Sequence, residues 1–265
     1  MSHGVLNGLE HIFDAARQRG LKVIAIIWLD ADAPVDNASI AKGIEEALQH
    51  PDTILRISCG SELRLRVGTA VAEPVIRDCL QRFRNAGVSQ PLGYIDTWWE
   101  WCNAAWPCQE WDLADAVDWI GINVFPWWEN KYSELFPCIP AEQVADFHTA
   151  RLRDLMNRYP EKEVLLTEFG WPACPERYSE TNQHTGQQCG VAGETKQRLV
   201  IEDTLIQLEQ ANLPGIVFEA FREPWKLGTE GVVGPCWGIC DESPPYRCRF
   251  PYGLRERAYL PMVLK

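Results

Sequence analysis

The chain lacks long apolar segments. No stretch approaches the about 20 consecutive apolar residues that a membrane-spanning helix needs. The apolar run Val23–Leu29 has only the length of a strand. The N-terminal residues MSHGVLNGLEH have neither the basic nor the apolar region of a signal peptide. We therefore expect a soluble chain without a membrane segment, and prior removal of a targeting segment or anchor is compatible with this.

Positive charge and metal-binding side chains are also scarce. The formal net charge is −12, and no run of basic residues stands out. An acidic surface repels phosphate backbones, so we expect no nucleic-acid partner, whereas a neutral polysaccharide carries no such penalty. Five histidines and no CxxC pair give a zinc cluster little support. No Gly-rich phosphate or dinucleotide loop is present. The sequence thus predicts neither a metal nor a cofactor.

Cysteine, in contrast, is abundant. Ten cysteines are many for a reduced cytosolic enzyme, and most fall in loop-like segments. This placement favours disulfides and a secreted, periplasmic or cell-wall-associated protein. Cys59 and Cys79 fall in a strand and a helix by pattern and are interpreted as buried thiols. The spacing leaves the disulfide connectivity open.

Helical and strand patterns alternate along the whole chain. Leu9, Ile12, Phe13 and Ala16 recur at helical spacing, and Gly20 ends that helix. Further helical patterns lie at Ile40–Leu48, Ile76–Phe83, Ala141–Tyr159 and Glu194–Asn212. The strand-like runs lack polar alternation, as expected of strands covered on both faces. They are Lys22–Leu29, Ile54–Cys59, Pro91–Thr97, Trp119–Phe125, Val164–Phe169 and Ile216–Phe221.

This alternation predicts an α/β fold with a parallel sheet and right-handed crossovers. No linker, repeat or low-complexity segment divides the chain, so residues 1–265 are expected to form a single (β/α)-barrel domain of the (β/α)8 TIM-barrel type. Six βα units are visible where a closed barrel needs eight. Because the first visible element is a helix, we expect the first two strands to be lacking at the N-terminal end.

Two glutamates occupy the ends of predicted strands. Glu62 lies just past the second strand, and Glu168 closes the fifth. A charge at the end of an apolar strand is costly unless something uses it, although a helix cap or an arginine partner is the simple alternative. In a (β/α) barrel such positions lie at the active-site face, so the pair is predicted to meet across the barrel mouth. Facing carboxylates suit glycoside hydrolysis.

Tryptophan is concentrated beside these positions. Eight of the 12 tryptophans fall between Trp98 and Trp128. Trp119 is expected in the core of a strand, whereas the others lie at or beyond strand ends. Large apolar surface there indicates a ligand, such as a pyranose ring, that covers it. The alternative is packing under loops held by Cys102 and Cys108, and we expect each interpretation to hold for some of these residues.

At these segments the sequence resembles glycoside hydrolase family 17, the β-1,3-glucanases and their transglycosylating bacterial and fungal relatives. LLTEFGWPA at 165–173 is similar to the family's nucleophile segment, and DWIGINVFPWWE at 118–129 resembles a strand that lines the sugar cleft. FEAFREPWKLGTEG at 218–231 is similar to the last strand and its loop, and WGICD at 237–241 fits the closing region. The resemblance extends from about Leu9 to about Asp241.

The resemblance implies a retaining mechanism with Glu168 as nucleophile and Glu62 as general acid/base, and no cofactor. It implies that Glu223, Lys226 and Glu230 support this pair. The substrate would be a β-glucan polysaccharide or oligosaccharide. The residues expected to bind it are Ser61, Trp98, Asn123, Phe125, Trp127, Trp128, Trp171, Phe221, Glu223, Lys226 and Glu230.

The sequence departs from the family pattern at two places. Ser61 stands where relatives carry an asparagine before the acid/base glutamate, and a serine cannot offer the same amide donor. The helix at Leu9–Arg19 is similar to the one that precedes the family's third strand, which is why the first two strands are expected to be missing. A fragment, a second chain that fills the gap, or a barrel with fewer strands would each account for this.

Three function classes remain open. The first is a retaining enzyme on β-1,3-glucan, and hydrolysis cannot be separated from transglycosylation. A catalytically weakened glucan-binding protein is the second, motivated by Ser61 and the missing strands, although both glutamates are present. A cysteine-dependent redox or metal protein is the third, and it rests on the cysteines alone, because no histidine lies close to a candidate nucleophilic cysteine.

Overall fold

The structure, a computed structural model, describes residues 11–175 and 178–249. These residues form two compact units. Within the described residues, unit 1 comprises 11–123 and 154–165, and unit 2 comprises 124–153, 166–175 and 178–249. Each unit is described by itself, and the predicted single domain over residues 1–265 stays a prediction.

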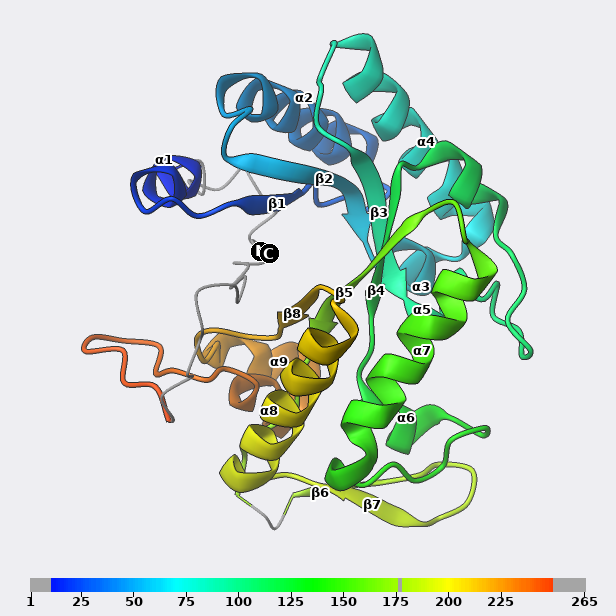
Figure 1. The fold of residues 1–265 in the computed structure, drawn as a ribbon, viewed down its shortest axis with the longest axis vertical. Helices are drawn as coiled ribbons and strands as arrows, with labels where there is room; N and C mark the ends of the chain where they lie inside the picture. The colour runs from blue at the N-terminus through cyan, green and yellow to red at the C-terminus, as the bar shows by residue number, and fades with distance from the viewer. Residues whose placement is uncertain (1–10, 176–177, 250–265) are drawn as a thin grey trace. The chain divides into compact units, whose positions relative to one another are not determined.

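Unit 1 contains four consecutive parallel strands. They are β1 (Val23–Ile26), β2 (Ile54–Ser61), β3 (Leu92–Thr97) and β4 (Trp119–Asn123), and each pairs with the next. The connecting helices are α1 (His11–Gln18), α2 (Ala33–Gln49), α3 (Leu63–Val67), α4 (Thr69–Asn85), α5 (Trp98–Trp101) and the 3-10 helix η2 (Asp112–Ala116). Helix α4 packs against α2 and contacts β2 and β3 (Figure 1). The strand–helix order is that expected of consecutive βα units.

The core of unit 1 explains one glycine of β3. Gly93 pairs with Trp119 across β3 and β4, and a Cβ on Gly93 would lie 2.2 Å from Cε2 of Trp119. Only glycine leaves room for this fully buried indole. Trp119 packs with Ile26, Ile95 and Leu165 in one buried cluster. The prediction that Trp119 is a core residue is confirmed.

Unit 2 is built around the end of β5 (Glu163–Phe169), a strand with residues in both units. Strand β8 (Gly215–Val217) pairs with β5 in parallel, and β6 (Ser179–Thr181) pairs with β7 (Gln188–Val191) in an antiparallel hairpin. The longer helices are α7 (Val144–Arg158), whose last residues belong to unit 1, and α8 (Glu194–Ala211), which contacts β8. The shorter ones are α6 (Pro126–Tyr132), η3 (Ala141–Gln143), η4 (Pro224–Lys226), α9 (Leu227–Glu230) and η5 (Gly231–Cys236).

All six predicted strands are present, but their ends differ from the prediction. The strand expected at Lys22–Leu29 is only Val23–Ile26, and that expected at Ile216–Phe221 ends at Val217. The β6–β7 hairpin was not predicted, because its sequence has neither an apolar run nor a two-residue Gly turn. Leu9, in the first predicted helix, lies outside the described residues.

Four disulfides join cysteines within single units, which confirms the predicted disulfide bonding. The interpretation of Cys59 and Cys79 as buried thiols is wrong, because strand β2 and helix α4 lie close enough for these two to bond. Among the described residues, Cys138 and Cys189 are the cysteines outside a disulfide. The disulfides are Cys59–Cys79, Cys102–Cys108, Cys174–Cys236 and Cys240–Cys248.

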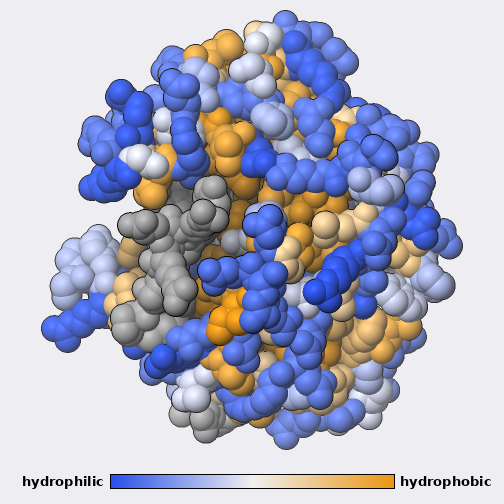
Figure 2. Space-filling view, in the orientation of Figure 1, coloured by the Kyte–Doolittle hydropathy of each residue, from blue (hydrophilic) through white to orange (hydrophobic). Residues whose placement is uncertain are grey.

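On the face shown in Figure 2, hydrophilic residues alternate with smaller hydrophobic areas. None of the described helices has the length and apolar character required to traverse a bilayer.

Candidate active site

The first candidate catalytic residue, Glu62, lies at the C-terminal end of β2. Its backbone has φ 54° and ψ 29°, a left-handed conformation that a residue with a side chain adopts only at a cost of about 1 kcal/mol or more. The Glu62 N–H donates to the Ile95 carbonyl of β3 at 2.9 Å. The side-chain amide of Asn123 donates to Oε1 of Glu62 at 2.9 Å. The half-buried carboxylate is thus held in place from two neighbouring strands.

Two further predicted residues lie beside Glu62 in unit 1. Ser61 and Asn123 end β2 and β4, and each is 1% exposed. The Ser61 hydroxyl has no hydrogen-bond partner within residues 11–175 and 178–249. One group is therefore formed by Ser61, Glu62 and Asn123. Within it, the buried Ser61 hydroxyl lies next to the Glu62 residue with its hydrogen-bonding capacity unsatisfied.

Trp98 does not have the exposure expected of a sugar platform. It is 2% exposed and packs edge-on against Trp99 and Trp106, with ring centroids 5.5 and 6.0 Å away. Of these three rings, Trp106 is the exposed one, at 41%. Of the two interpretations, packing within the protein therefore holds for the Trp98 ring, and its role in substrate binding stays a prediction.

The second candidate catalytic residue, Glu168, lies at the corresponding end of β5, within unit 2. It is 1% exposed, and its carbonyl accepts a hydrogen bond from the Val124 N–H at 3.0 Å. The chain turns directly after it at Gly170, where a Cβ would lie 2.2 Å from the Phe218 carbonyl oxygen. This close approach requires glycine and fixes the turn that follows Glu168.

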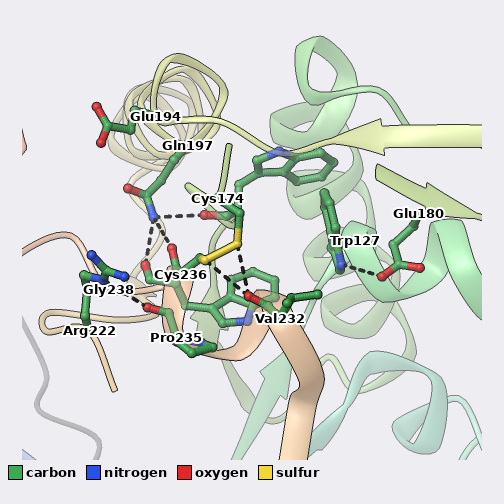
Figure 3. The surroundings of a disulfide bond; sticks show 12 residues. Trp127, Cys174, Glu180, Glu194, Gln197, Arg222, Val232, Pro235, Cys236 and Gly238 are labelled. Carbon is green, nitrogen blue, oxygen red and sulfur yellow. Dashed lines mark hydrogen bonds between the residues drawn. A yellow bond between two sulfur atoms is a disulfide. The ribbon is translucent and has the colours of Figure 1, made fainter. Parts of the chain in front are cut away.

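Two tryptophans that were predicted to bind substrate pack against each other in the same unit. Trp127 and Trp171 are both fully buried and meet edge-to-face, with centroids 5.3 Å apart. Trp127 donates to Oε1 of Glu180 at 3.2 Å (Figure 3). Trp171 donates to the Val191 carbonyl at 3.0 Å. Both indoles are covered by protein and stabilise the β6–β7 hairpin, and their role in substrate binding stays a prediction.

The remaining predicted aromatics divide into two sets. Phe125 and Trp128 are half-buried and contact Trp237, at 5.2 and 6.1 Å between centroids. Phe221, at 43% exposure, pairs with Tyr246 at 5.4 Å. Phe125 and Trp128 therefore share one aromatic group, whereas Phe221 belongs to a different contact.

A buried cation lies between two carboxylates in the same unit. The Lys226 side chain is 0% exposed, and its Nζ lies 2.5 Å from Oε2 of Glu219 and 2.7 Å from Oε2 of Glu223. It also lies 4.1 Å from the ring centroid of Phe218. Glu230 ends helix α9 on the same loop. The predicted association of Lys226 with Glu223 is therefore present, and Phe218 connects this cluster to the turn after Glu168.

Glu219 was not among the predicted site residues, yet the pKa of its carboxyl is strongly raised. Burial raises the pKa of Glu219 to about 8, against the lowering effect of Lys226, and Glu223 adds to the rise. The signal for it was present, because Glu219 follows the apolar strand β8 just as Glu168 ends β5. It was missed because the strand was expected to continue to Phe221.

Gln197 and a disulfide fix the loops of unit 2 around Trp171 and Trp237. The Gln197 amide donates to the Trp171 carbonyl at 3.0 Å and to the Trp237 carbonyl at 2.8 Å. Figure 3 shows it beside the Cys174–Cys236 disulfide. These contacts join α8 to two segments that are far apart in the sequence, and so hold the aromatic group in place.

A pocket of about 580 Å³ is lined by both cysteines of this disulfide. Its charged lining residues are Glu194, Arg222, Asp241, Arg247 and Arg249. No residue predicted to bind substrate lines it. Arg249 forms an ion pair with Glu194 at 3.3 Å, so two of the charged side chains of this pocket neutralise each other.

Comparison with known proteins gives a family and a fold. The family model for the BtgE/BtgC glycoside hydrolase domain matches residues 4–238. A probable beta-glucosidase of Aspergillus flavus, btgE, is 26% identical over 244 residues, which cover 89% of this chain and 35% of that protein. The chain thus spans little more than a third of the length of this curated relative.

Two solved structures share the fold. An active-site mutant of a Rhizomucor miehei β-1,3-glucanosyltransferase, in complex with laminaritriose, matches with a TM-score of 0.66 and 17% identity, over 91% of this chain and 82% of that one. An endo-laminarinase from Formosa Hel1_33_131 matches with a TM-score of 0.70 and 16% identity, over 90% and 73%. The likeness shows a TIM-barrel-like fold, as predicted, and the lack of the first two strands stays a prediction.

Proposed function

Because the chain belongs to the BtgE/BtgC glycoside hydrolase domain family, we propose that it is a glycosidase that acts on β-1,3-linked glucan by a retaining mechanism. In this proposal Glu168 is the nucleophile and Glu62 the general acid/base. The supporting observation is that each carboxylate ends a parallel strand and is held there, Glu62 by the Asn123 amide and Glu168 by burial. Strand ends of this fold are where reacting groups gather.

The reaction would proceed in two displacements. Glu62 donates a proton to the departing glycosidic oxygen while Glu168 attacks the anomeric carbon and forms a covalent glycosyl-enzyme. Glu62 then takes a proton from the acceptor, which attacks the same carbon and releases Glu168. The Asn123 amide, which donates to Oε1, orients the carboxyl that makes both proton transfers.

The acceptor decides between hydrolysis and transglycosylation. Water gives shorter products, whereas a sugar hydroxyl gives longer ones. The Aspergillus flavus relative is named a probable beta-glucosidase, the Rhizomucor miehei neighbour is a β-1,3-glucanosyltransferase and the Formosa neighbour an endo-laminarinase. Incubation with laminari-oligosaccharides of one defined length, followed by separation of the products by size, distinguishes the two outcomes.

The nucleophile is tested by Glu168→Gln. This nearly isosteric change should lower turnover by at least about 10³-fold while laminari-oligosaccharide binding persists. Glu163→Gln is the matched control, because Glu163 begins the same strand, is exposed and pairs with Arg56 at 2.6 Å. A rate for Glu168→Gln close to that of Glu163→Gln would exclude the assignment.

The acid/base is tested by Glu62→Ala. The kcat/KM for oligosaccharides should fall by about 10²–10⁴-fold, but that for an aryl β-glucoside with a good leaving group much less, since kcat/KM reports the first displacement and such a group needs no proton there. NMR of the first anomer released tests retention, which requires carboxyls about 5–5.5 Å apart. An inverted product would exclude a covalent intermediate on Glu168.

A glucan-binding protein with weakened catalysis is the second candidate. It is favoured by the buried Ser61 hydroxyl, which stands at the position of a family amide and has no partner among the described residues. Binding of laminari-oligosaccharides without any turnover, unchanged in Glu168→Gln, would support it. Gain of activity in Ser61→Asn would instead show that the enzyme lacks only this amide donor.

We further propose that the protein works outside the cell, on an extracellular β-glucan. The disulfides within each unit require an oxidising compartment. The net charge of −12 leaves a neutral polysaccharide as a more suitable partner than a polyanion.

A further inference from the structure

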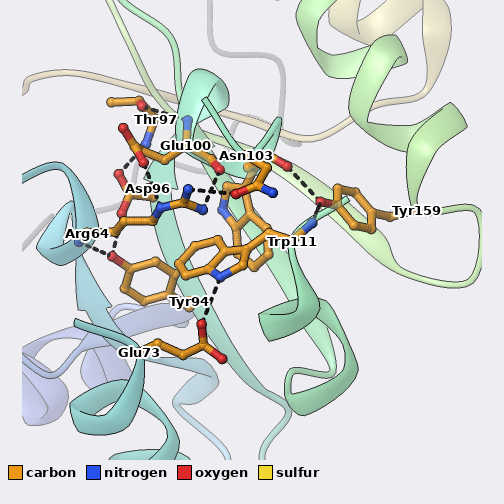
Figure 4. Close-up of polar contacts among 10 residues, drawn as sticks. Arg64, Glu73, Tyr94, Asp96, Thr97, Glu100, Asn103, Trp111 and Tyr159 are labelled. Atoms are coloured by element: carbon orange, nitrogen blue, oxygen red, sulfur yellow. Dashed lines mark hydrogen bonds and ion pairs between the residues drawn. The ribbon is translucent and has the colours of Figure 1, made fainter. Parts of the chain in front are cut away.

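Two buried polar residues of β3 lie beside the turn that carries Glu62. Asp96 is 0% exposed, and its Oδ2 accepts a hydrogen bond from the Tyr94 hydroxyl. Its Oδ1 accepts one from the Thr97 N–H at 2.8 Å (Figure 4). Tyr94 is also fully buried. Burial of a carboxyl costs free energy unless the group has hydrogen-bond partners. The presence of Asp96 inside β3 therefore indicates a role for this carboxyl.

The Tyr94 hydroxyl connects this carboxyl to the Glu62 turn. It accepts a hydrogen bond from the backbone N–H of Arg64 at 3.0 Å, two residues after Glu62. The Glu62 N–H itself donates to the Ile95 carbonyl at 2.9 Å. Strand β3 therefore holds the turn at two points. Because Glu62 has a positive φ, the turn would relax if one of these contacts were lost.

The side chain of Arg64 fixes the same turn from the opposite direction. Its guanidinium lies 2.8 Å from Oε2 of Glu100 and 2.8 Å from Oδ1 of Asn103. It also lies over the Trp111 ring, 4.3 Å from the centroid (Figure 4). Because the side chain of Arg64 is fixed in this way, the backbone N–H of Arg64 is held in position to donate to the Tyr94 hydroxyl.

The charges around Asp96 are mainly negative. Burial raises the pKa of Asp96 to about 8, and the carboxylates of Glu62 and Glu100 add to the rise. The hydrogen bonds from the Tyr94 hydroxyl and the Thr97 N–H oppose it. Asp96 is therefore neutral below about pH 8, and above that pH it places a negative charge beside Glu62.

We propose that Tyr94 and Asp96 are positioning residues for the general acid/base. Through the backbone of Arg64 they hold the Glu62 carboxyl in its productive orientation, and Asp96 does this without a second negative charge next to it at neutral pH. The inference deepens the proposed function and rests on the role assigned there to Glu62.

Tyr94→Phe tests the contact to the turn, since it removes only the hydroxyl. We expect kcat on laminari-oligosaccharides to fall by about 10–100-fold with little change in KM, because a small misplacement of the acid is costly. On an aryl β-glucoside with a good leaving group the loss in kcat/KM, which reports the first displacement alone, should be less than about threefold, since no proton is needed in that step. Equal losses on both substrates would overturn the proposal.

Tyr159→Phe is the matched control. Tyr159 lies in the same unit, and its hydroxyl also bridges two backbone groups, the Trp101 carbonyl at 2.6 Å and the Trp111 N–H at 2.8 Å. It should lose a comparable amount of thermal stability without any dependence on the leaving group. If Tyr159→Phe showed the same dependence as Tyr94→Phe, the effect would be general loosening, and the proposal would be wrong.

Asp96→Asn tests the charge. The amide keeps the size of the carboxyl and an oxygen for the Thr97 N–H, but it cannot ionise. At pH 6 both side chains are neutral, so the kcat of each protein at this pH is the reference against which its own alkaline limb is compared. The decline in kcat of the wild type above about pH 8 should be reduced in the variant. An unchanged alkaline limb would overturn this part of the inference.

Glu62→Ala, measured on the same two substrates, separates the two levels of the argument. If Glu62→Ala shows no dependence on the leaving group, the acid/base assignment itself fails, and the positioning role fails with it. If Glu62→Ala shows the dependence and Tyr94→Phe does not, only the positioning role fails.

Discussion

Substitution of Lys226 by methionine tests the buried ion pairs of unit 2. Methionine is similar in length to lysine but leaves Glu219 and Glu223 without the cation that lies 2.5 and 2.7 Å from their oxygens. Removal of one partner from a buried ion pair typically costs about 3–5 kcal/mol. Because Glu219 can take up a proton, we expect the lower end of this range, about 3 kcal/mol, at pH 6.

The cost should grow at alkaline pH. In the folded wild type, burial raises the pKa of Glu219 from its ordinary value of 4.5 to about 8. Stability from this group is therefore full below about pH 4.5 and is lost as the pH rises to about 8. Without Lys226 the pKa of Glu219 rises further, so in the variant the loss continues above pH 8 at up to about 1.4 kcal/mol per pH unit. The deficit of the variant should thus be larger at pH 9 than at pH 6.

Urea unfolding, followed by tryptophan fluorescence at the two pH values, measures this. Lys196→Met is the control, because Lys196 is 33% exposed and pairs with Glu142 at the surface. An exposed pair contributes about 0–1 kcal/mol, with little change between the two pH values. If Lys226→Met cost no more than Lys196→Met at both pH values, the assignment of a buried cation between two carboxyls would be refuted.

Three further predictions concern packing, titration and thiols. Gly93→Ala should cost about 1–3 kcal/mol and lower the thermal midpoint, because the new Cβ would lie 2.2 Å from Trp119; an unchanged midpoint would contradict this. The unfolding free energy of the wild type should fall between about pH 4 and pH 8 more steeply than that of Asp96→Asn, since the pKa of Asp96 is raised to about 8; parallel urea-derived profiles would count against it. Thiol titration of the unfolded, unreduced protein should detect Cys138 and Cys189 and no other cysteine.

The sequence was sufficient to predict the strands that are covered on both faces. Val164–Phe169 was predicted because it is mainly apolar and lacks polar alternation, and the strand is Glu163–Phe169. The relationship to β-1,3-glucanases was predicted from the segment around Glu168, and the family match confirms it. Such features are local, because strand character and a short turn motif depend on neighbouring residues alone.

Strand ends and aromatic exposure depend on contacts that are distant in the sequence. Strand β8 ends at Val217, and the next carbonyl, that of Phe218, lies directly against Gly170, 48 residues earlier in the chain (218 − 170). Trp127 and Trp171 are buried because they pack on each other, although 44 residues separate them (171 − 127). No local pattern encodes such pairings, and so the sequence did not reveal that these rings are covered by protein.

A buried carboxyl with a raised pKa occurs in each unit. In unit 1, Asp96 adjoins the Glu62 turn, and in unit 2, Glu219 adjoins Phe218, which contacts the turn after Glu168. For both Asp96 and Glu219, burial raises the pKa to about 8. An ionised carboxylate at Asp96 would add repulsion to Glu62, whereas a neutral acid still offers hydrogen bonds. Apolar residues would pack in β3 without needing such partners. The buried acid of β3 therefore argues for a polar role at the Glu62 turn, one that limits the negative charge around this candidate catalytic residue.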